Sequence, residues 1–278
     1  MTDQSEPLFL LGPGYSAKAL ADLWSGPIIA SARSAEKQAG LQTAGWSAVL
    51  TSDQDAMERA CVGAHLIVSA PPNASGCPIQ QALGPAISRA ASVTYLSTTG
   101  VYGDLNGGWV FEWSPVHPGS ERGARRVAAE LAWSEAFPDV RLVRLPGIYG
   151  PRRSPLDRVQ KPGAQRIIKP GQVFSRIHVA DLAAGLKALI LSGETGVFHL
   201  CDEEAAPPQD VLAYAADLLG IAAPPAIDFE TADLSDMARS FYSECKRVSN
   251  ARLKAVTGWR PDYPTYREGL RSIAGLKD

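Results

Sequence analysis

The chain lacks the features that mark membrane-spanning and secreted proteins. Among its 278 residues, no apolar segment approaches the ~20 residues that a bilayer-spanning helix needs. The stretch from Met1 to Glu6 is polar and acidic, which is the opposite of a signal peptide. We therefore expect a cytoplasmic protein without a membrane partner.

Paired cysteines and metal-ligand patterns are also missing. The four cysteines are scattered, which indicates reduced thiols without a catalytic role. The histidines at 65, 117 and 199 have no cysteine or carboxylate at metal-ligand spacing, so we expect no bound metal. The cysteines are Cys61, Cys77, Cys201 and Cys245.

Charge of one sign is not in excess. Lysine and arginine together number 27, aspartate and glutamate 29, and the formal net charge is −2 without a long block of like charge. Nucleic-acid binding requires a basic stripe that neutralises phosphates. We therefore expect a small-molecule ligand and no nucleic-acid partner.

Short apolar runs alternate with helical patterns through the first two thirds of the chain. This alternation is typical of βαβ units, and it predicts an α/β fold with a Rossmann-type, doubly wound parallel sheet. Strands are predicted at 8–11, 28–32, 48–50, 65–69, 92–97, 140–145 and 196–200, and helices at 16–24, 55–60, 79–91, 121–136 and 181–191. Residues 1–150, completed by 178–202, are predicted to form the dinucleotide-binding domain. Residues 151–177 and 203–278 are richer in proline and turns, and they are predicted to form a smaller C-terminal substrate lobe.

The first predicted strand runs into a glycine-containing turn, Gly12 to Ala17, that precedes a helix. Gly12 allows the tight turn, Gly14 lets the backbone approach a pyrophosphate, and the small Ala17 allows close packing of helix and strand. Tyr15 and Ser16 complete the turn, where free N–H groups at the helix N-terminus attract an anion. These residues predict a dinucleotide site.

Arg33 and Ser34 follow the second predicted strand, where an NAD-selective protein usually carries Asp or Glu. A guanidinium can bind a 2′-phosphate through two hydrogen bonds, whereas a carboxylate repels it. The sequence therefore favours NADP, with NAD as the alternative cofactor. A solvated surface arginine is the competing interpretation of Arg33.

Ligands of open parallel sheets bind outside the carboxyl ends of the strands. The residues that follow the later strands are therefore further candidates for cofactor contacts. They are Ala70 and Pro71, Ser97, and Pro146.

Five motifs occur in a characteristic order and spacing: Gly12 to Ala17, Tyr95 to Gly103, Arg144 to Pro151, Arg176 to Ala183, and Gly258 to Leu270. Together they resemble the extended short-chain dehydrogenase/reductase superfamily, in its NAD(P)-dependent epimerase/dehydratase class. Within that class, the chain is most similar to an atypical bacterial subgroup that resembles nucleoside-diphosphate-sugar epimerases. The resemblance implies an oxidoreductase or epimerase that acts on a sugar nucleotide or a similar anionic, hydroxylated small molecule. It also implies a homodimer, packed through the helices that flank the fifth strand.

The chain departs from this family at the residues that carry the proton. The family uses a Ser or Thr after the fifth strand, which falls on Thr98, and a Tyr-x-x-x-Lys pair on the next helix. Aligned by the following Ala-Ala-Glu, the tyrosine position carries Arg122 and the lysine position Arg126. Arginine is effectively never deprotonated, so it cannot replace a phenol as proton carrier. Tyr102 is the nearest substitute, and packing of its ring against the helix is the alternative.

The sequence allows two interpretations for several arginines. Arg122 and Arg126 lie one helical turn apart, and with Thr98 they are candidates for a catalytic or substrate site. A solvated helix face that includes Arg125 is the alternative. Arg152 and Arg153 follow the third motif, where they are candidates for a substrate phosphate or simply part of a solvated loop.

Two residues of the fourth family motif are predicted to be structural. His178 and Asp181 form the turn that opens the helix at 181–191, and Asp181 is predicted to be its N-cap. Thr98 has a similar alternative role, in which its hydroxyl caps backbone groups at the strand end.

The sequence leaves two functions open. One is an NADP-dependent oxidoreductase or epimerase, supported by the cofactor turn and Thr98. The other is a non-catalytic NADP(H)-binding redox sensor or pseudoenzyme, supported by Arg122 and Arg126 in place of tyrosine and lysine.

Overall fold

Seven parallel strands form the central sheet of the computed structural model, which describes residues 5–276. Their order across the sheet is β11-β7-β5-β4-β1-β2-β3, as in a doubly wound fold whose strand order reverses beside β1. This arrangement confirms the predicted fold class. The strands are β1 (Leu8–Leu11), β2 (Ile28–Ala32), β3 (Ser47–Leu50), β4 (His65–Val68), β5 (Ser92–Thr98), β7 (Arg141–Leu145) and β11 (Gly196–His199).

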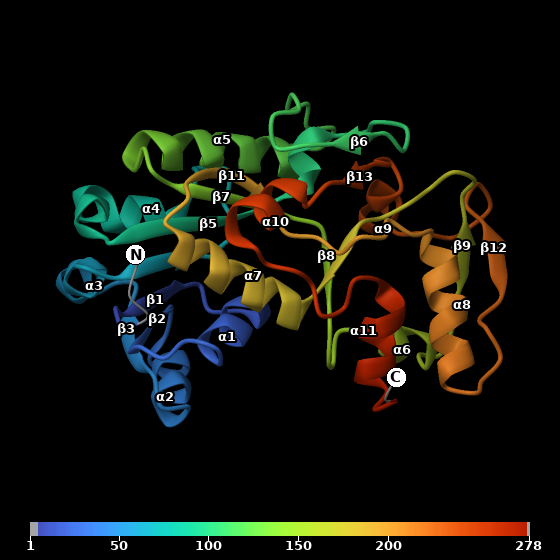
Figure 1. The fold of residues 1–278 in the computed structure, drawn as a ribbon, viewed down its shortest axis with the longest axis horizontal. Helices are drawn as coiled ribbons and strands as arrows, with labels where there is room; N and C mark the ends of the chain where they lie inside the picture. The colour runs from blue at the N-terminus through green and yellow to red at the C-terminus, as the bar shows by residue number, and fades with distance from the viewer. Residues whose placement is uncertain (1–4, 277–278) are drawn as a thin grey trace.

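Helices cover both faces of this sheet, as Figure 1 shows. Successive side chains of a strand point to opposite faces. Leu8 and Leu10 of β1 accordingly pack with α1 and α7, whereas Phe9 and Leu11 pack on the side of α3, α4 and α5. The helices are α1 (Tyr15–Ala21), α2 (Ala35–Thr43) and α7 (Val179–Ser192) on one face, and α3 (Gln54–Cys61), α4 (Pro78–Leu83) and α5 (Glu121–Ala136) on the other.

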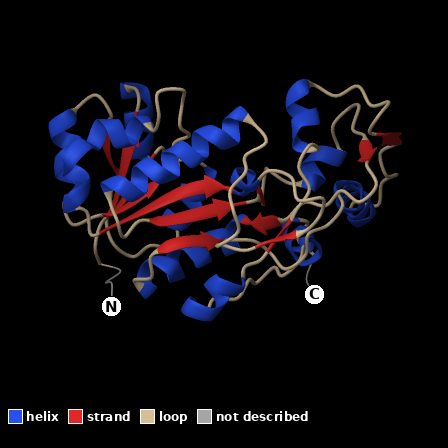
Figure 2. Cartoon of the chain, turned by 90° about the horizontal axis from the view of Figure 1, so that it is seen from above, coloured by secondary structure: helices blue, strands red, loops and turns tan. Residues whose placement is uncertain are grey.

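A smaller, loop-rich part of the chain lies beyond the sheet, and the arrowheads of the strands point toward it (Figure 2). Three of its helices share a separate apolar core that includes Leu156, Leu212 and Leu270. Its elements are β8 (Gly147–Tyr149), α6 (Pro155–Val159), β9 (Arg166–Ile168), β10 (Arg176–His178), α8 (Pro208–Leu218), β12 (Ala226–Asp228), α9 (Asp236–Phe241) and α11 (Tyr266–Ile273).

The segment 203–278 does not belong wholly to this smaller part. Helix α10 (Ala251–Thr257) and the residues after it return to the large sheet, where Leu253 and Trp259 join the core beneath α7. Strand β13 (Arg247–Val248) pairs with β6 (Trp109–Val110), which lies between the 3₁₀ helix η2 (Thr99–Tyr102) and α5. The sequence did not predict this return, because apolar spacing does not say which core a helix joins.

Two local expectations were wrong, and one helix was missed. Helix α2 was not predicted, because Leu41 is its only buried residue and its apolar spacing is weak. The helix expected over 79–91 ends as α4 at Leu83, and a 3₁₀ helix, η1 (Gly84–Arg89), follows because Gly84 has φ +49° and precedes a proline. His178, not Asp181, is the N-cap of α7: it accepts the N–H of Ala180, while Asp181 accepts the backbone N–H groups of Asp262 and Tyr263.

Two absences can be stated for the described part of the chain. From residue 5 to residue 276, no helix combines the length and the apolar character that crossing a bilayer requires. Nor does this range contain a group of three or more His, Cys, Asp or Glu side chains placed to hold a metal ion.

Candidate functional site

The turn between β1 and α1 has the shape that a pyrophosphate requires. Gly12 has φ +79°, and a Cβ at this position would lie 2.9 Å from Ala70 at the end of β4. A Cβ at Gly14, by contrast, would meet only the Gly12 carbonyl oxygen, at 4.0 Å, so space is left in front of the helix. The N–H groups of Tyr15, Ser16 and Ala17 open α1 and have no acceptor within the helix. These residues fit a dinucleotide phosphate held on the helix N-terminus.

Hydrogen bonds from the neighbouring strands fix this turn. The Gly12 N–H donates to the Ser31 hydroxyl of β2 at 3.0 Å, and the Ser69 hydroxyl after β4 donates to the Gly12 carbonyl. Ala70 N–H donates to the carbonyl of Leu11 at 3.2 Å. The ends of β1, β2 and β4 are therefore tied together, with Ala70 beside the glycine turn and Pro71 exposed next to it.

Basic and hydroxyl groups gather at the end of β2. Arg33 is exposed, and Ser34 caps α2 by accepting the N–H of Lys37 at 3.2 Å. Ser34 and Lys37 line a groove of about 850 Å³ between α1 and α2, together with Lys18 of α1 and Arg152. The sequence analysis did not include Lys37. Its position three residues after Ser34, in the first turn of the helix that follows Arg33, could have indicated that it lies near the end of β2. Three cations, Lys18, Lys37 and Arg152, thus line this groove, with Glu36 and Asp22 as its acidic residues.

Arg152 and Arg153 lie against the cofactor turn. They form a tight turn in which the Tyr15 hydroxyl donates to the Pro151 carbonyl at 3.0 Å and the Arg153 guanidinium lies 5.8 Å from the Tyr15 ring centroid. Arg152 has φ +63°, which is rare for a residue with a long side chain. The structure therefore brings these two substrate candidates to the N-terminus of α1.

The end of β5 carries Thr98, which is half-buried. Its hydroxyl oxygen accepts the N–H of Gly100 at 3.2 Å and so caps the 3₁₀ helix η2. This capping was the structural alternative for Thr98, and it leaves the hydroxyl proton available to a ligand. Ser97 is buried, and its hydroxyl donates to Glu130 of α5 at 2.5 Å, so its side chain is turned away from the strand end. Pro146 follows β7 and is half-buried.

Arg122 and Arg126 occupy the helix positions expected from the sequence. Arg122 is exposed in the first turn of α5. Arg126 is half-buried, and its Nη1 donates to the Leu96 carbonyl at 2.8 Å and to the Tyr95 hydroxyl at 3.1 Å. The β4–β5 ladder ends at the pair Val68 and Tyr95, which leaves the Leu96 carbonyl free for the guanidinium. A fixed cation thus lies beside the ends of β4 and β5.

Comparison with known proteins places this geometry in a family. No family model matches the chain. A structure of a conserved protein of unknown function from Silicibacter pomeroyi DSS is 43% identical over 98% of this chain and 100% of its own, with a TM-score of 0.90. The chain belongs to the same family as that protein.

Two more distant matches have described activities. UDP-glucuronic acid 4-epimerase from Bacillus cereus, solved in complex with NAD, is 15% identical over 97% of both chains, with a TM-score of 0.76. The chain thus has the fold of the NAD-dependent epimerases and dehydratases that its motifs resemble. A 3-diazoavenalumate denitrifying reductase from Streptomyces sp is 31% identical over 102 residues, and the match spans only about a third of the length of that relative (33%) and 35% of this chain.

Tyr102 does not reach the strand ends as a proton carrier would. Its side chain is 1% exposed, and its hydroxyl lies 2.6 Å from Nε2 of His199 and accepts from Nη1 of Arg144 at 2.7 Å. Burial raises the pKa of this phenol, and the charge of Arg144 only partly opposes the shift. The geometry favours the packing alternative for Tyr102, because its hydroxyl is enclosed by protein groups.

A buried polar network surrounds Tyr102, and sequence reasoning did not find it. Glu130 of α5 forms an ion pair with Arg144 of β7 at 2.7 Å, and both side chains are almost fully buried. His199 Nδ1 lies 2.9 Å from the Ser249 carbonyl, and burial lowers the pKa of this imidazole to about 4. The neutral ring therefore donates through Nδ1 and accepts the Tyr102 proton at Nε2. This network links α5, β7 and β11. It reaches the residue before Thr98, because Ser97 donates to Glu130.

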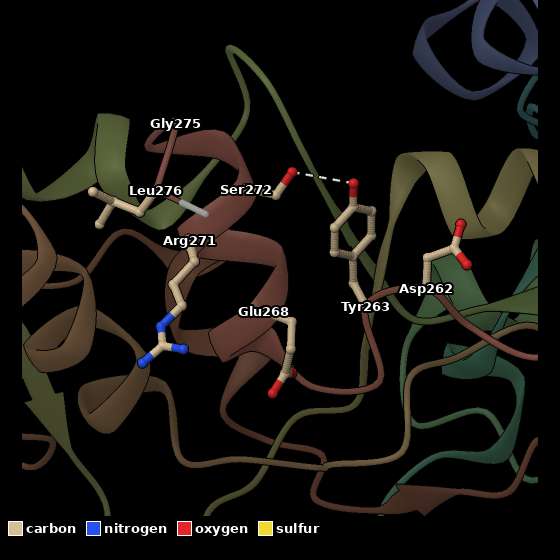
Figure 3. Close-up of a pocket in the computed structure, with 7 residues that line it drawn as sticks. All are labelled: Asp262, Tyr263, Glu268, Arg271, Ser272, Gly275 and Leu276. Carbon is tan, nitrogen blue, oxygen red and sulfur yellow. Dashed lines mark hydrogen bonds between the residues drawn. The ribbon is translucent and has the colours of Figure 1, made fainter. Parts of the chain in front are cut away.

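A second hollow, of about 410 Å³, lies on the surface beside α11 (Figure 3). Glu268, which lines it, accepts from the backbone and hydroxyl of Thr265 in a capping box, and the Ser272 hydroxyl donates to that of Tyr263 at 3.1 Å. These side chains stabilise the ends of α11. None of the candidate residues lies here.

Proposed function

We propose that this protein binds NADP(H) across the carboxyl ends of its strands and acts as a reductase. The observation that carries the proposal is the turn at Gly12, which only a glycine fits, together with the exposed Arg33 that follows β2 and Lys37 of α2 in the groove beside α1. When bound there, the nicotinamide would supply a hydride. The smaller part of the chain beyond the strand ends would complete the substrate site, as the sequence predicted for a substrate lobe.

Reduction fits the residues better than epimerisation does. An epimerase that oxidises and reduces a hydroxyl must remove its proton and return it, which requires an acid-base group such as the tyrosine of the family. Arg122 and Arg126 cannot take or give that proton. A reductase can work without such a group if its product needs no proton during hydride transfer.

The comparisons support a nicotinamide dinucleotide as the ligand and a reductase activity. The B. cereus epimerase holds NAD in the same fold, and the partial Streptomyces relative is described as a reductase. The substrate predicted from the sequence, a sugar nucleotide or a similar anionic small molecule, agrees with the UDP-sugar substrate of the epimerase. Cationic residues near the strand ends suit any substrate of this charge.

The choice of cofactor can be tested at Arg33. Removal of a charge-assisted hydrogen bond costs about 1.5–3 kcal/mol, or roughly a 10- to 100-fold loss of affinity. We expect Arg33→Asp to weaken NADPH binding by that factor and to leave NADH binding nearly unchanged, as measured by fluorescence titration of the nicotinamide. Arg125→Asp, on the exposed face of α5, is the matched control. Equal losses for both cofactors at Arg33 would refute the 2′-phosphate assignment.

A non-catalytic NADP(H) sensor is the second candidate, favoured by the loss of the acid-base pair. Both candidates predict NADPH binding, but only the reductase oxidises NADPH when a substrate is present. A panel of sugar nucleotides, aldehydes, ketones and conjugated acceptors distinguishes them. Tight NADPH binding without turnover on any member would favour the sensor.

A further inference from the structure

The two elements that carry Thr98, Arg122 and Arg126 meet at the carboxyl end of β5. The first turn of α5 packs directly on the segment after Thr98, because a Cβ at Gly123 would lie 2.8 Å from the Gly100 carbonyl. Arg122 is adjacent to this contact, and Arg126 lies one helical turn further on the same face. Thr98, Arg122 and Arg126 thus come from two elements that touch.

The positive charge at this place has no carboxylate partner within residues 5–276. Arg126 is held through Nη1 by two neutral oxygen atoms, which leaves its other N–H groups without a partner in the described chain. The nearest carboxylate along the helix, Glu130, is committed to Arg144 and Ser97. Arg125 differs, because it pairs with Glu121 on the exposed face. Arg126 can therefore offer its remaining N–H donors to an anionic ligand.

We propose that Thr98, Arg122 and Arg126 form an oxyanion site that binds a phenolate-type oxygen of the reduced substrate. The Thr98 hydroxyl, whose oxygen already accepts from Gly100, donates its proton to that oxygen, and the two guanidinium groups stabilise the negative charge. This inference rests on the proposed reductase function. It replaces the sugar-nucleotide substrate expected from the sequence with quinonoid acceptors, such as quinones and quinone methides.

The basicity of the anion that hydride addition produces is the reason for choosing this substrate class. Addition of a hydride to a ketone gives an alkoxide, which is about as basic as hydroxide, the conjugate base of water with its pKa of about 15.7. Such a product needs an acid at the moment of transfer. Addition of a hydride to the exocyclic carbon of a quinone methide forms one C–H bond, and the π electrons pass through the ring to the oxygen. The resulting phenolate has a conjugate acid with a pKa of about 10, and it takes its proton from water after release.

Three phenol and imidazole groups near this strand end, those of Tyr95, Tyr102 and His199, are enclosed. Tyr102 and His199 bond to each other, and Tyr95 accepts from Arg126 while burial raises its pKa to about 12. None of them is placed to protonate a product. The fixed cations can therefore stabilise an oxyanion but cannot neutralise it by proton transfer.

The binding of 4-nitrophenol tests this site without any turnover, because its anion absorbs visible light. We expect the full-length protein to bind the anion selectively and so to lower the apparent pKa of the probe in spectrophotometric titrations. Arg126→Gln and Arg122→Gln should each raise the Kd of the anion about 10-fold, and Thr98→Val should raise it severalfold. Arg125→Gln, the matched control on the same helix, should leave the Kd unchanged. Circular dichroism verifies that each variant is folded.

Three results would overturn the inference: no preference for the anion, equal Kd values for the Arg126 and Arg125 variants, or displacement of the probe by an equal concentration of inorganic phosphate. NADPH titration of the same samples separates the two proposals. NADPH binding without 4-nitrophenolate binding refutes the oxyanion site and leaves the reductase. Failure of NADPH to bind refutes the reductase, and with it the assignment of the oxyanion site to a reduced product.

Discussion

At the scale of single residues, the buried network around Tyr102 supports the candidate site. Arg144 donates to both Glu130 and Tyr102, so its charge is balanced by a carboxylate and its donors are satisfied. Buried charges are tolerated only when they are paired and hydrogen-bonded in this way. The network therefore fixes the end of β5 through the hydrogen bond from Ser97 to Glu130. Its members have a structural role.

The phenol of Tyr102 can be removed without loss of ring packing. In Tyr102→Phe, the Nη1 group of Arg144 and Nε2 of His199 each lose a partner in a buried environment. We expect the free energy of unfolding to fall by about 1–3 kcal/mol, as for other buried groups left unsatisfied. Urea unfolding measures this loss, and NADPH titration should give an unchanged Kd. Unchanged stability with weakened cofactor binding would instead indicate that the hydroxyl reaches the ligand.

His199 makes the stability depend on pH. Burial lowers the pKa of its ring to about 4 in the folded chain, whereas an exposed histidine has a pKa near 6.5. As the pH falls between these values, the unfolded chain gains a proton that the folded chain does not, so folding becomes less favourable. Relative to His199→Gln, the wild type should lose up to about 3 kcal/mol between pH 7.5 and pH 4.5. Urea unfolding of both proteins at the two pH values gives this difference. A difference that stays constant with pH would show that His199 titrates normally.

At the scale of elements, strand runs and turn glycines could be read from the sequence because each depends on neighbouring residues. The order of apolar runs predicted the parallel sheet, and Gly12 to Ala17 predicted the cofactor turn. Helix α2 escaped notice because Leu41 is its only buried residue, so its sequence has no clear apolar spacing. The pairing of Glu130 with Arg144, the enclosure of Tyr102 and the position of α10 depend on contacts between distant segments, which periodicity does not encode.

Two helical glycines allow an element-level test with opposite outcomes. A Cβ at Gly123 of α5 would lie 2.8 Å from the Gly100 carbonyl and 2.9 Å from Pro118 Cβ, whereas a Cβ at Gly40 of α2 would meet no atom within 4 Å. Gly123→Ala should therefore cost about 1–3 kcal/mol through overpacking. Gly40→Ala should stabilise the protein by about 0.5–1 kcal/mol, because alanine favours the helix. Thermal and urea unfolding of both variants measures these effects. The same sign for both changes would contradict the packing of α5 on η2.

At the scale of the whole molecule, the segment after α9 forms hydrogen bonds with the loop that leads into α5. Lys246 Nζ donates to the Gly103 carbonyl at 2.6 Å, and the Cys245 N–H donates to the Asp104 carboxylate at 2.7 Å. Beside this contact, β13 pairs with β6. The segment after α9 thus holds the loop between Thr98 and α5, so the two elements of the proposed oxyanion site depend on residues from the last part of the chain.

The outer face of α5 is where we expect a second copy of the chain to pack. Leu131 is 62% exposed there, in line with the exposed Ala124 and Ala128 at helical spacing. In a two-fold dimer built on this helix, Leu131 lies near its counterpart, and a charge at that position faces a like charge. We expect light scattering after size-exclusion chromatography to give a dimer mass for the wild type and a monomer mass for Leu131→Glu. Ile221→Glu, at an exposed position after α8, is the matched control and should stay dimeric. A monomeric wild type, or a dimer that survives Leu131→Glu, would place the interface elsewhere or remove it.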